Sequence, residues 1–385
     1  MTPEEKDETR RRAMANFDRA VSLDEQKQRK QRAKERKARR SGDEPRARER
    51  VRDEDDWDEL EDFQPMGSSR KGPLAPRVSS TTVAAGPPDT PGALDGTVIA
   101  VARDGARVVC GSQTLKVPMR REEDLAVGDR ARVIPLTTEL ARLVGRHERR
   151  TELARADPTM PGRRRVLAAN VDLALVVLSV VGPPFKPGLF DRFQVALIAG
   201  GIEPRMVVNK VDLLADEDAR AELEARLAPY REAGVRVHLV SASAGLGLDE
   251  LIREIAGRTI VAVGHSGVGK SSLLNALDPE GAERVTSQVR ESDGKGRHTT
   301  TSSELRRLSN GTVLIDTPGI RALGLATEQL AALDEAFPEV SALAADCRFG
   351  DCRHDSEPDC AVRAALESGE LDRARWDAYR RMGAG

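Results

Sequence analysis

Aromatic residues are scarce in this chain of 385 residues: they make up 3% of it, whereas charged residues make up 32%. Such a composition implies that part of the chain does not pack into a core. Long hydrophobic runs are also missing, because the longest, residues 173–181, is far too short to cross a bilayer. No apolar stretch follows the first charged residues either. We therefore expect a cytoplasmic protein that does not associate with membranes.

Cysteine is rare as well, with four residues, and three of them crowd with a histidine into one window. This crowding argues against the disulfide framework of a secreted protein. Cys347, Cys352, His354 and Cys360 follow the pattern C-x4-C-x-H-x5-C. Three thiolates and an imidazole suit a closed tetrahedral site, so we predict one structural Zn²⁺ ion there. Scattered core cysteines are the alternative, which the polar intervening residues disfavour. Cys110 is interpreted as a buried strand residue.

The net charge of −2 conceals a strong segregation of charge. Residues 27–40 are almost entirely basic and residues 53–62 almost entirely acidic. Residues 1–92 also include a stretch rich in Pro, Gly, Ser and Thr, which cannot bury enough apolar surface to offset chain entropy. We predict a disordered charged tail and linker over 1–92, with a transient helix at 23–40. The basic block is either a solvated helix face or an arm attracted to nucleic-acid phosphates.

Short strands broken by turn residues replace this pattern from residue 96 to about 155. Several such strands without helical periodicity predict a small β-barrel, which we assign to residues 93–155. An oligonucleotide-binding (OB-like) barrel is the natural candidate, and the loops of such barrels commonly face RNA. The pattern alone does not separate it from other small barrels.

Strands and helices alternate after residue 165, which we assign to an α/β domain over 156–330. The expected strands are residues 173–180, 206–208, 235–240 and 260–263, and the expected helices are residues 217–233 and 248–256. Apolar strands separated by amphipathic helices predict a parallel sheet covered on both faces. Ligands of such sheets bind at the carboxyl ends of the strands.

The sequence GHSGVGKS, residues 264–271, has the full pattern of a phosphate-binding loop. It follows the expected strand 260–263 and opens an expected helix, 272–277, which disfavours a ligand-free glycine-rich turn. Lys270 is expected to reach the β- and γ-phosphates as a catalytic cation, and Ser271 to bind Mg²⁺ through its hydroxyl. The expected nucleotide-binding residues of this loop are Gly264, Ser266, Gly267, Val268, Gly269, Lys270, Ser271 and Ser272.

A second motif, DTPG at 316–319, follows a short apolar strand at 312–315. Asp316 is expected to hold Mg²⁺ through water, and the N–H of Gly319 to sense the γ-phosphate. Between the two motifs, residues 292–305 are rich in Gly and hydroxyl side chains and suggest a mobile loop ordered by Mg²⁺. Thr299 or Thr300 could be a further magnesium ligand; we assign Thr300, although the spacing does not choose between them.

The residue after DTPG is Ile320, where many GTPases have a glutamine that orients water. Intrinsic hydrolysis should therefore be slow unless another residue orients the water. His298 is the nearby candidate for this catalytic role, and an ordinary exposed loop histidine is the alternative.

The sequence NKVD, residues 209–212, follows an apolar strand and predicts a guanine-reading loop. The Asp212 carboxylate can accept from N1–H and the exocyclic amine of guanine, whereas adenine would leave it unpaired at a cost of about 1–3 kcal/mol or more. Asn209 and Lys210 belong to the same loop. Ser241 and Ala242, in SAS at 241–243, are expected to add a backbone N–H to the base. This loop precedes the phosphate loop, the reverse of the usual order.

Together, the motifs resemble one family, the ribosome small-subunit-dependent GTPase A family, whose members are circularly permuted bacterial GTPases. The resemblance runs from about residue 96 to 382. It rests on VGRHERRTELAR, AANVD, NKVDLL, GHSGVGKSSLLN, GRHTTT, DTPG and CRFGDCRHDSEPDCAV. The tail lies outside it.

The resemblance implies an OB-like barrel, a permuted GTPase domain and a zinc-binding helical domain, here residues 331–385. It implies binding of GTP and GDP, and docking on the small ribosomal subunit and its rRNA late in maturation. The family also has a hydrophobic residue at the position of Ile320 and gives hydrolytic importance to the histidine matched by His298. We expect a monomeric GTPase stimulated by the ribosome. A nucleotide-gated RNA-binding assembly factor with negligible turnover is the alternative, and a large-subunit permuted GTPase is disfavoured by the barrel and the zinc window.

Overall fold

The computed structural model describes residues 90–102, 104–119, 124–156, 164–183, 185–278, 283–284, 303–316 and 325–383. All of them belong to one compact unit, residues 60–385. Up to residue 89 the predicted tail, with its transient helix at 23–40, lies outside the described residues. Among the described helices, none is long and apolar enough to span a membrane.

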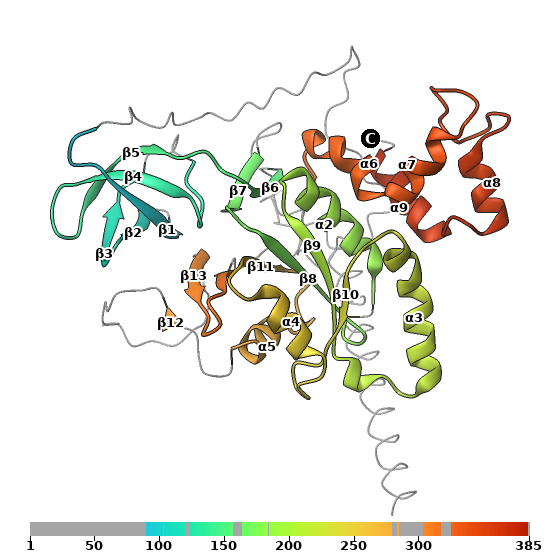
Figure 1. Cartoon of the computed structure of the whole chain (residues 1–385), viewed down its shortest axis with the longest axis horizontal. Helices are drawn as coiled ribbons and strands as arrows, with labels where there is room; N and C mark the ends of the chain where they lie inside the picture. Colours follow the sequence, from blue (N-terminus) through green and yellow to red (C-terminus); the bar gives the residue numbers. More distant parts are fainter. Residues whose placement is uncertain are drawn as a thin grey trace, which may run out of the picture. The chain divides into compact units, whose positions relative to one another are not determined.

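A curled antiparallel sheet forms the first part of the described chain (Figure 1). Its strands are β1 (Leu94–Ala102), β2 (Gly105–Cys110), β3 (Gln113–Val117), β4 (Arg130–Pro135) and β5 (Ala141–Arg146). Strand β1 pairs with both β2 and β4, and β4 pairs with β5. Alternate residues such as Val108, Leu115 and Val133 are fully buried inside the curl. The predicted OB-like architecture is confirmed, and Cys110 is a buried strand residue as expected.

Strand β6 (Glu152–Ala156) lies in the range predicted for the barrel but pairs elsewhere. It forms a separate two-stranded antiparallel sheet with β7 (Arg164–Ala169). The residues between β5 and β6 therefore carry the chain out of the curled sheet. The boundaries 92, 155 and 330 stay predictions.

A parallel sheet follows, with the order β10-β9-β8-β11-β14. Its strands are β8 (Leu173–Ser179), β9 (Glu203–Asn209), β10 (Val237–Leu239), β11 (Thr259–Val263) and β14 (Val313–Asp316). Strand β13 (Ser303–Arg307) pairs antiparallel with β14 on one side and with β1 on the other. A two-residue strand, β12 (Glu283–Arg284), pairs with β13. The strand that leads to the phosphate loop, β11, lies between β8 and β14, although it comes after β8, β9 and β10 in the chain.

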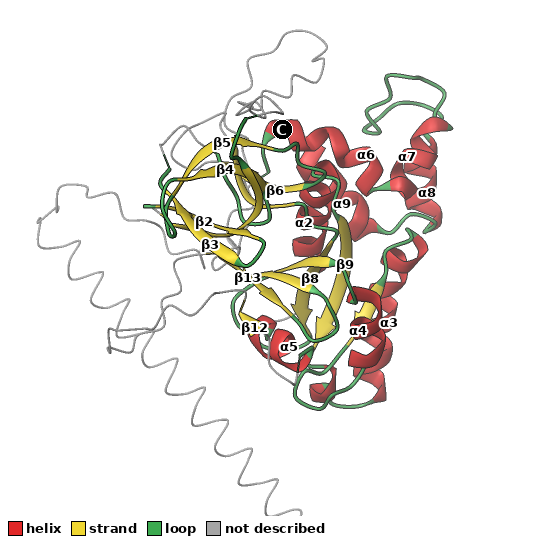
Figure 2. Ribbon diagram, turned by 60° about the vertical axis from the view of Figure 1, so that its left-hand side comes forward, coloured by secondary structure: helices red, strands yellow, loops and turns green. Residues whose placement is uncertain are grey.

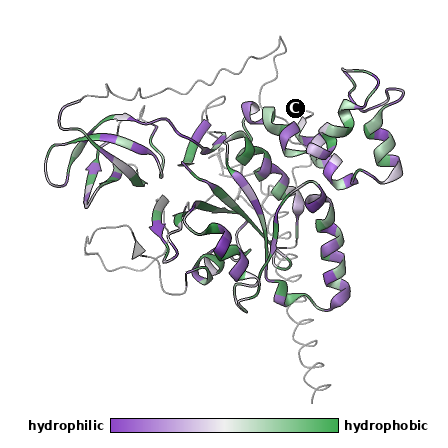
Figure 3. Ribbon diagram, viewed as in Figure 1, coloured by the Kyte–Doolittle hydropathy of each residue, from purple (hydrophilic) through white to green (hydrophobic). Residues whose placement is uncertain are grey.

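Helices cover both faces of this sheet, as predicted (Figure 2). On one face, alternate residues of β8 share a hydrophobic core with α2 (Pro187–Ala199) and α3 (Glu217–Glu232). The intervening β8 residues share a second core with α4 (Leu248–Ile255) and α5 (Lys270–Ala276) on the other face. In Figure 3 the strands between the helices are hydrophobic, whereas α3 alternates between hydrophobic and hydrophilic residues. Helix α2 and the strands β7, β12 and β13 have no counterpart among the predicted elements. Strand β13 includes residues 303–305, the end of the predicted mobile loop 292–305, because they pair with β14 and β1; residues 292–302 lie outside the described residues.

Short helices make up the C-terminal part, as predicted. They are a 3₁₀ helix (Thr327–Ala332), α6 (Leu333–Ala336), α7 (Pro338–Ala345), α8 (Ala361–Ser368) and α9 (Arg373–Gly383). Their core contains Phe337, Val340, Val362 and Trp376, and it also takes in Val195 of α2.

Candidate nucleotide site and metal centre

The predicted motifs gather at one edge of the parallel sheet. Strand β9 ends at Asn209, β11 ends directly before Gly264, and β14 ends at Asp316. Carboxyl ends of parallel strands share an edge, which is where ligands of α/β sheets bind. Segments far apart in the sequence thus meet in one place.

Asn209 joins three of these segments through one buried side chain. Its Nδ2 donates to the Val268 carbonyl oxygen at 3.0 Å, within the phosphate loop. Its Oδ1 accepts from the N–H of Lys210 at 2.8 Å and from the N–H of Ala242 at 3.1 Å. The amide therefore fixes the NKVD and SAS segments against the phosphate loop before any ligand is considered.

Lys210 adds a second clamp from a left-handed backbone conformation, with φ 66°. Its Nζ donates to the carbonyl oxygen of Gly267 at 2.7 Å, in the phosphate loop. It also donates to the carbonyl oxygens of Val181 and Gly182, at 3.1 and 2.9 Å. The NKVD segment therefore holds the residues directly after β8 as well.

The carboxylate of Asp212 remains on the exposed side of this assembly. It lies in a short 3₁₀ helix, Val211–Leu213, where the Ser243 hydroxyl donates to it at 3.4 Å. Ser241 is buried, and its Oγ accepts from the N–H of Ala244 at 3.0 Å. Ser241 thus shapes the SAS turn, while Asp212 keeps acceptor capacity for a partner.

The glycines of the phosphate loop are required by close contacts. Gly264 has φ 137°, and a Cβ there would lie 2.2 Å from the Val177 carbonyl oxygen. Gly269 has φ 90°, and a Cβ there would lie 2.5 Å from Nδ2 of Asn209. These backbone conformations suit glycine and resist L side chains. The Lys270 ammonium closes the loop by donating to the carbonyl oxygens of Gly264 and His265, at 2.6 and 2.5 Å.

Oxygen atoms suited to Mg²⁺ are present on two of the segments. Ser271 is exposed in the first turn of α5. Asp316 ends β14, and its Oδ2 lies 3.8 Å from a guanidinium nitrogen of Arg306. The other predicted residues of this part, His298, Thr300 and Gly319, lie outside the described residues.

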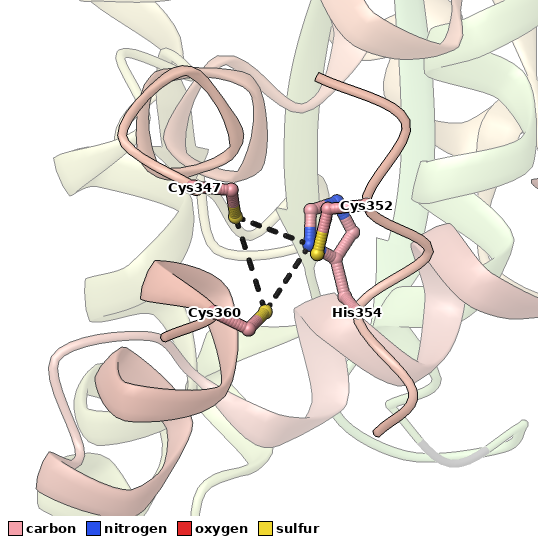
Figure 4. Close-up of side chains that lie close together, drawn as sticks. All are labelled: Cys347, Cys352, His354 and Cys360. Atoms are coloured by element: carbon pink, nitrogen blue, oxygen red, sulfur yellow. Dashed lines mark hydrogen bonds between the residues drawn. The ribbon is translucent and has the colours of Figure 1, made fainter. Parts of the chain in front are cut away.

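The four predicted zinc ligands come together between α7 and α8, with side chains pointing toward one another (Figure 4). Their ligand atoms all lie within 4.8 Å of one another. Nδ1 of His354 is 3.5 Å from Sγ of Cys347 and 3.4 Å from Sγ of Cys360. Three sulfur atoms and one imidazole nitrogen at this spacing fit a single tetrahedral metal ion.

The surroundings prepare two of these ligands, Cys347 and His354, for a metal. Burial raises the pKa of the Cys347 thiol, but hydrogen bonds with the backbone of Val362 and Ala361 and with the side chains of Cys360 and Cys352 together lower it. Burial lowers the pKa of His354, which favours the neutral imidazole that binds metals. Burial raises the pKa of Cys352 to about 11, so a metal must displace the proton of that thiol.

Comparison with known proteins decides the family. Residues 146–326 match the family model described as RsgA GTPase. The "Small ribosomal subunit biogenesis GTPase RsgA" of Sodalis glossinidius (strain morsitans) is 42% identical over 240 residues, which are 61% of this chain and 68% of that protein. The protein of the same name from Gemmatimonas aurantiaca is 40% identical over 66% of this chain and 82% of its own length. The chain belongs to the RsgA GTPase family.

Two solved structures show the same architecture. "YjeQ from Thermotoga maritima" superposes with a TM-score of 0.58 at 28% identity, covering 75% of this chain and 97% of that one. "YloQ, a circularly permuted GTPase" gives a TM-score of 0.56 at 30% identity, covering 76% and 94%. An RsgA GTPase hydrolyses GTP, so the chain is an enzyme, with the permuted motif order that the sequence predicts.

Sequence reasoning missed one part of this RsgA site, namely residues 181–183. They contact Lys210 through two carbonyl oxygens, and the Gly182 oxygen lies 3.4 Å from where a Cβ on Gly267 would stand. Their contacts use backbone atoms, so no residue type marks them. The run of small and proline residues VVGPP after a buried strand is the available signal.

Proposed function

We propose that the chain is a GTPase that binds the small ribosomal subunit, assists its late maturation and is stimulated by it. The observation that carries this proposal is the joining of the NKVD and phosphate loops at one sheet edge by Asn209. The relatives' name, small ribosomal subunit biogenesis GTPase, supports the choice of partner. In this proposal the chain acts as a cytoplasmic monomer that binds rRNA.

Residues of the described loops take distinct roles in this proposal. Asp212 recognises guanine with its exposed carboxylate, while Ser241 and Ala242 shape the turn beside it. Gly264 to Ser272 cradle the phosphates, and Lys270 leaves its loop carbonyls to follow negative charge onto them.

Mg²⁺ would be held by Ser271, Asp316 and Thr300, and it would neutralise charge on the β- and γ-phosphates. We propose that the N–H of Gly319 senses the γ-phosphate. His298 orients the attacking water in place of the glutamine that Ile320 replaces. These assignments follow from the family resemblance and from the ends of β11 and β14.

The cysteine and histidine cluster is proposed to hold one structural Zn²⁺ ion. The donor set supports this choice, because three thiolates and an imidazole favour zinc over hard cations. Four protein ligands leave no open position, so the ion would organise the C-terminal helices and take no part in hydrolysis.

Phosphate release from GTP, measured with and without purified small subunits, tests the function. We expect slow basal turnover and a large stimulation by small subunits, with large subunits as the matched control. Equal turnover in all three samples would contradict stimulation. Small-subunit binding without any turnover would favour the nucleotide-gated assembly factor instead.

A further inference from the structure

Five of the described aromatic residues lie where the C-terminal helices meet α2 and α3. Phe190 of α2 and Tyr230 of α3 meet edge to face, with ring centroids 5.7 Å apart. On the other side, Phe337 meets Tyr379 at 5.6 Å, and Tyr379 stacks on Trp376 at 5.7 Å. Aromatic pairs of this kind contribute large buried areas with defined geometry. The contact between the C-terminal helices and α2 and α3 therefore resembles a hydrophobic core and not a loose interface.

Arg375 lies at the centre of this contact, with 1% of its surface exposed. Its guanidinium lies between two rings, 4.1 Å from the centroid of Phe337 and 4.8 Å from that of Tyr230. Its Nη1 donates to Asp191 of α2 at 2.5 Å, and its Nε donates to Glu339 of α7 at 2.7 Å. One buried cation thus binds α2, α3, α7 and its own helix together.

The pairing with Asp191 is specific to a guanidinium. Nη2 of Arg375 also donates to the Ala336 carbonyl oxygen at 3.2 Å, so three nitrogen atoms of the fork are used. The Tyr230 hydroxyl donates to the second oxygen of Asp191 at 3.2 Å. An ammonium group cannot reproduce a planar fork that spans three acceptors.

Helix α2 leads from this contact back to the nucleotide site. It begins at Pro187, a few residues after the carbonyl oxygens of Val181 and Gly182 that Lys210 holds. Arg226 of α3 fixes the intervening segment, because it donates to the Phe185 carbonyl oxygen at 2.9 Å and covers the Phe185 ring. A shift of α2 would therefore move the backbone that Lys210 holds.

The metal cluster lies at the other end of the same chain of contacts. The ring of His354 meets Trp376 edge to face at 5.8 Å, and Trp376 directly follows Arg375 in α9. A metal ion that orders the loop of His354 would therefore also fix the surface against which α9 packs.

We propose that Arg375 is a positioning residue that couples the metal cluster to the nucleotide site through α2. The inference rests on the proposed guanine and zinc sites, and it adds that the two sites influence each other. Such coupling is reciprocal, so a nucleotide that orders residues 181–183 must also stabilise the metal-bound C-terminal helices. This coupling can be detected without measuring hydrolysis.

The test is the zinc affinity of the full chain, measured by competition with a chromogenic chelator at equilibrium, with and without saturating GDP. In the wild type we expect GDP to protect the bound zinc by raising this affinity roughly fivefold or more, the usual scale of coupling between sites. ATP is the control nucleotide and should have no effect. Protection by GDP should vanish in Arg375→Lys, which keeps the charge but loses the fork. Arg373→Lys, an exposed position on the same helix, should keep the protection.

Asp191→Asn provides a second route, because it breaks the same contact from α2 and leaves the C-terminal helices unaltered. The inference is supported if either well-folded variant loses the protection. It is overturned if GDP leaves the zinc affinity of the wild type unchanged although GDP binding is measured in the same sample. Protection that survives in both variants would overturn it too. A wild type that binds no GDP would overturn the proposed function, and with it this inference.

Discussion

The Asn209 side chain and the Val268 backbone, 59 positions apart, are joined by a hydrogen bond of 3.0 Å from Nδ2 to the carbonyl oxygen. This bond makes the guanine-reading and phosphate-binding segments one structural unit. Because it joins a side chain on β9 to the loop after β11, it depends on the sheet and not on which strand comes first. A permuted chain keeps the site intact for this reason.

Asp212→Asn should remove the preference for guanine. The amide can no longer accept from both N1–H and the exocyclic amine, while its own N–H can donate to the 2-oxo group of xanthine. We expect GTP affinity to fall by about tenfold or more, equal to about 1.4 kcal/mol, and XTP affinity to rise. Titration of wild type and variant with GTP, ATP and XTP measures this. Equal wild-type affinity for ATP and GTP would disprove the assignment.

Gly269→Ala should disrupt both predicted nucleotide loops at once. Its Cβ would lie 2.5 Å from Nδ2 of Asn209, at a φ of 90°. The left-handed conformation costs an alanine about 1–2 kcal/mol, and the clash breaks the bond to Val268. We expect GDP affinity to fall by at least tenfold. Gly188→Ala is the control, because nothing lies within 4 Å of its added Cβ. Equal GDP affinity in both variants would contradict the prediction.

The sequence predicted the nucleotide segments because their information is local. A buried strand followed by NKVD or GHSGVGKS identifies the strand itself. It also predicts that the motif lies at the carboxyl edge of the sheet, where that strand ends. The metal cluster was equally accessible, since all four ligands lie within fourteen residues. The positions of the parallel strands and of helices α3, α4 and α5 were confirmed for the same reason.

Contacts between distant residues were beyond such reasoning. Arg375 and Asp191 are 184 positions apart, and each resembles an ordinary surface charge in its own segment. Helix α2 was missed because it is apolar on several sides: Phe190, Phe193, Val195 and Leu197 are all fully buried. One side packs on the sheet and another on the C-terminal helices, so no single amphipathic stripe marks it.

Lys270→Ala should abolish hydrolysis while leaving the fold intact. The ammonium donates to the carbonyl oxygens of Gly264 and His265 in its own loop, and Lys270 belongs to none of the hydrophobic cores, so its removal should disturb no core packing. It removes the cation that stabilises charge at the β- and γ-phosphates, and we expect turnover to fall by about a hundredfold or more. Phosphate release and circular dichroism measure the two effects. Lys116→Ala, exposed in the barrel, should keep basal turnover. Wild-type turnover in Lys270→Ala would remove the loop from the mechanism.

His298→Ala should slow the stimulated reaction and leave GTP affinity little changed. The reason is that a residue orienting water acts on the transition state and makes no contact required for binding. Single-turnover hydrolysis with small subunits gives the rate constant of the chemical step, and a separate GTP titration gives the affinity. A loss confined to affinity would show that His298 only binds the nucleotide.

Cys352→Ser should abolish metal binding and unfold the C-terminal helices. Closing four ligands around Zn²⁺ contributes roughly 10–16 kcal/mol in small zinc modules, a large share of the stability of so short a segment. We expect zinc content to fall from about one per chain, with loss of small-subunit binding and stimulated hydrolysis. GTP binding should persist, because none of the ligands lies in the nucleotide site, but it should weaken several-fold without the Arg375 contact.

Cys110→Ala is the matched control for this experiment, because it removes a thiol from the barrel core and leaves the four ligands in place. Its zinc content should stay at one per chain, as measured by elemental analysis of the purified protein. The comparison separates loss of a ligand from loss of any cysteine. Full zinc retention and normal small-subunit binding in Cys352→Ser would show that the cluster is not a structural metal site, since a closed site cannot lose one of its four ligands without weakening.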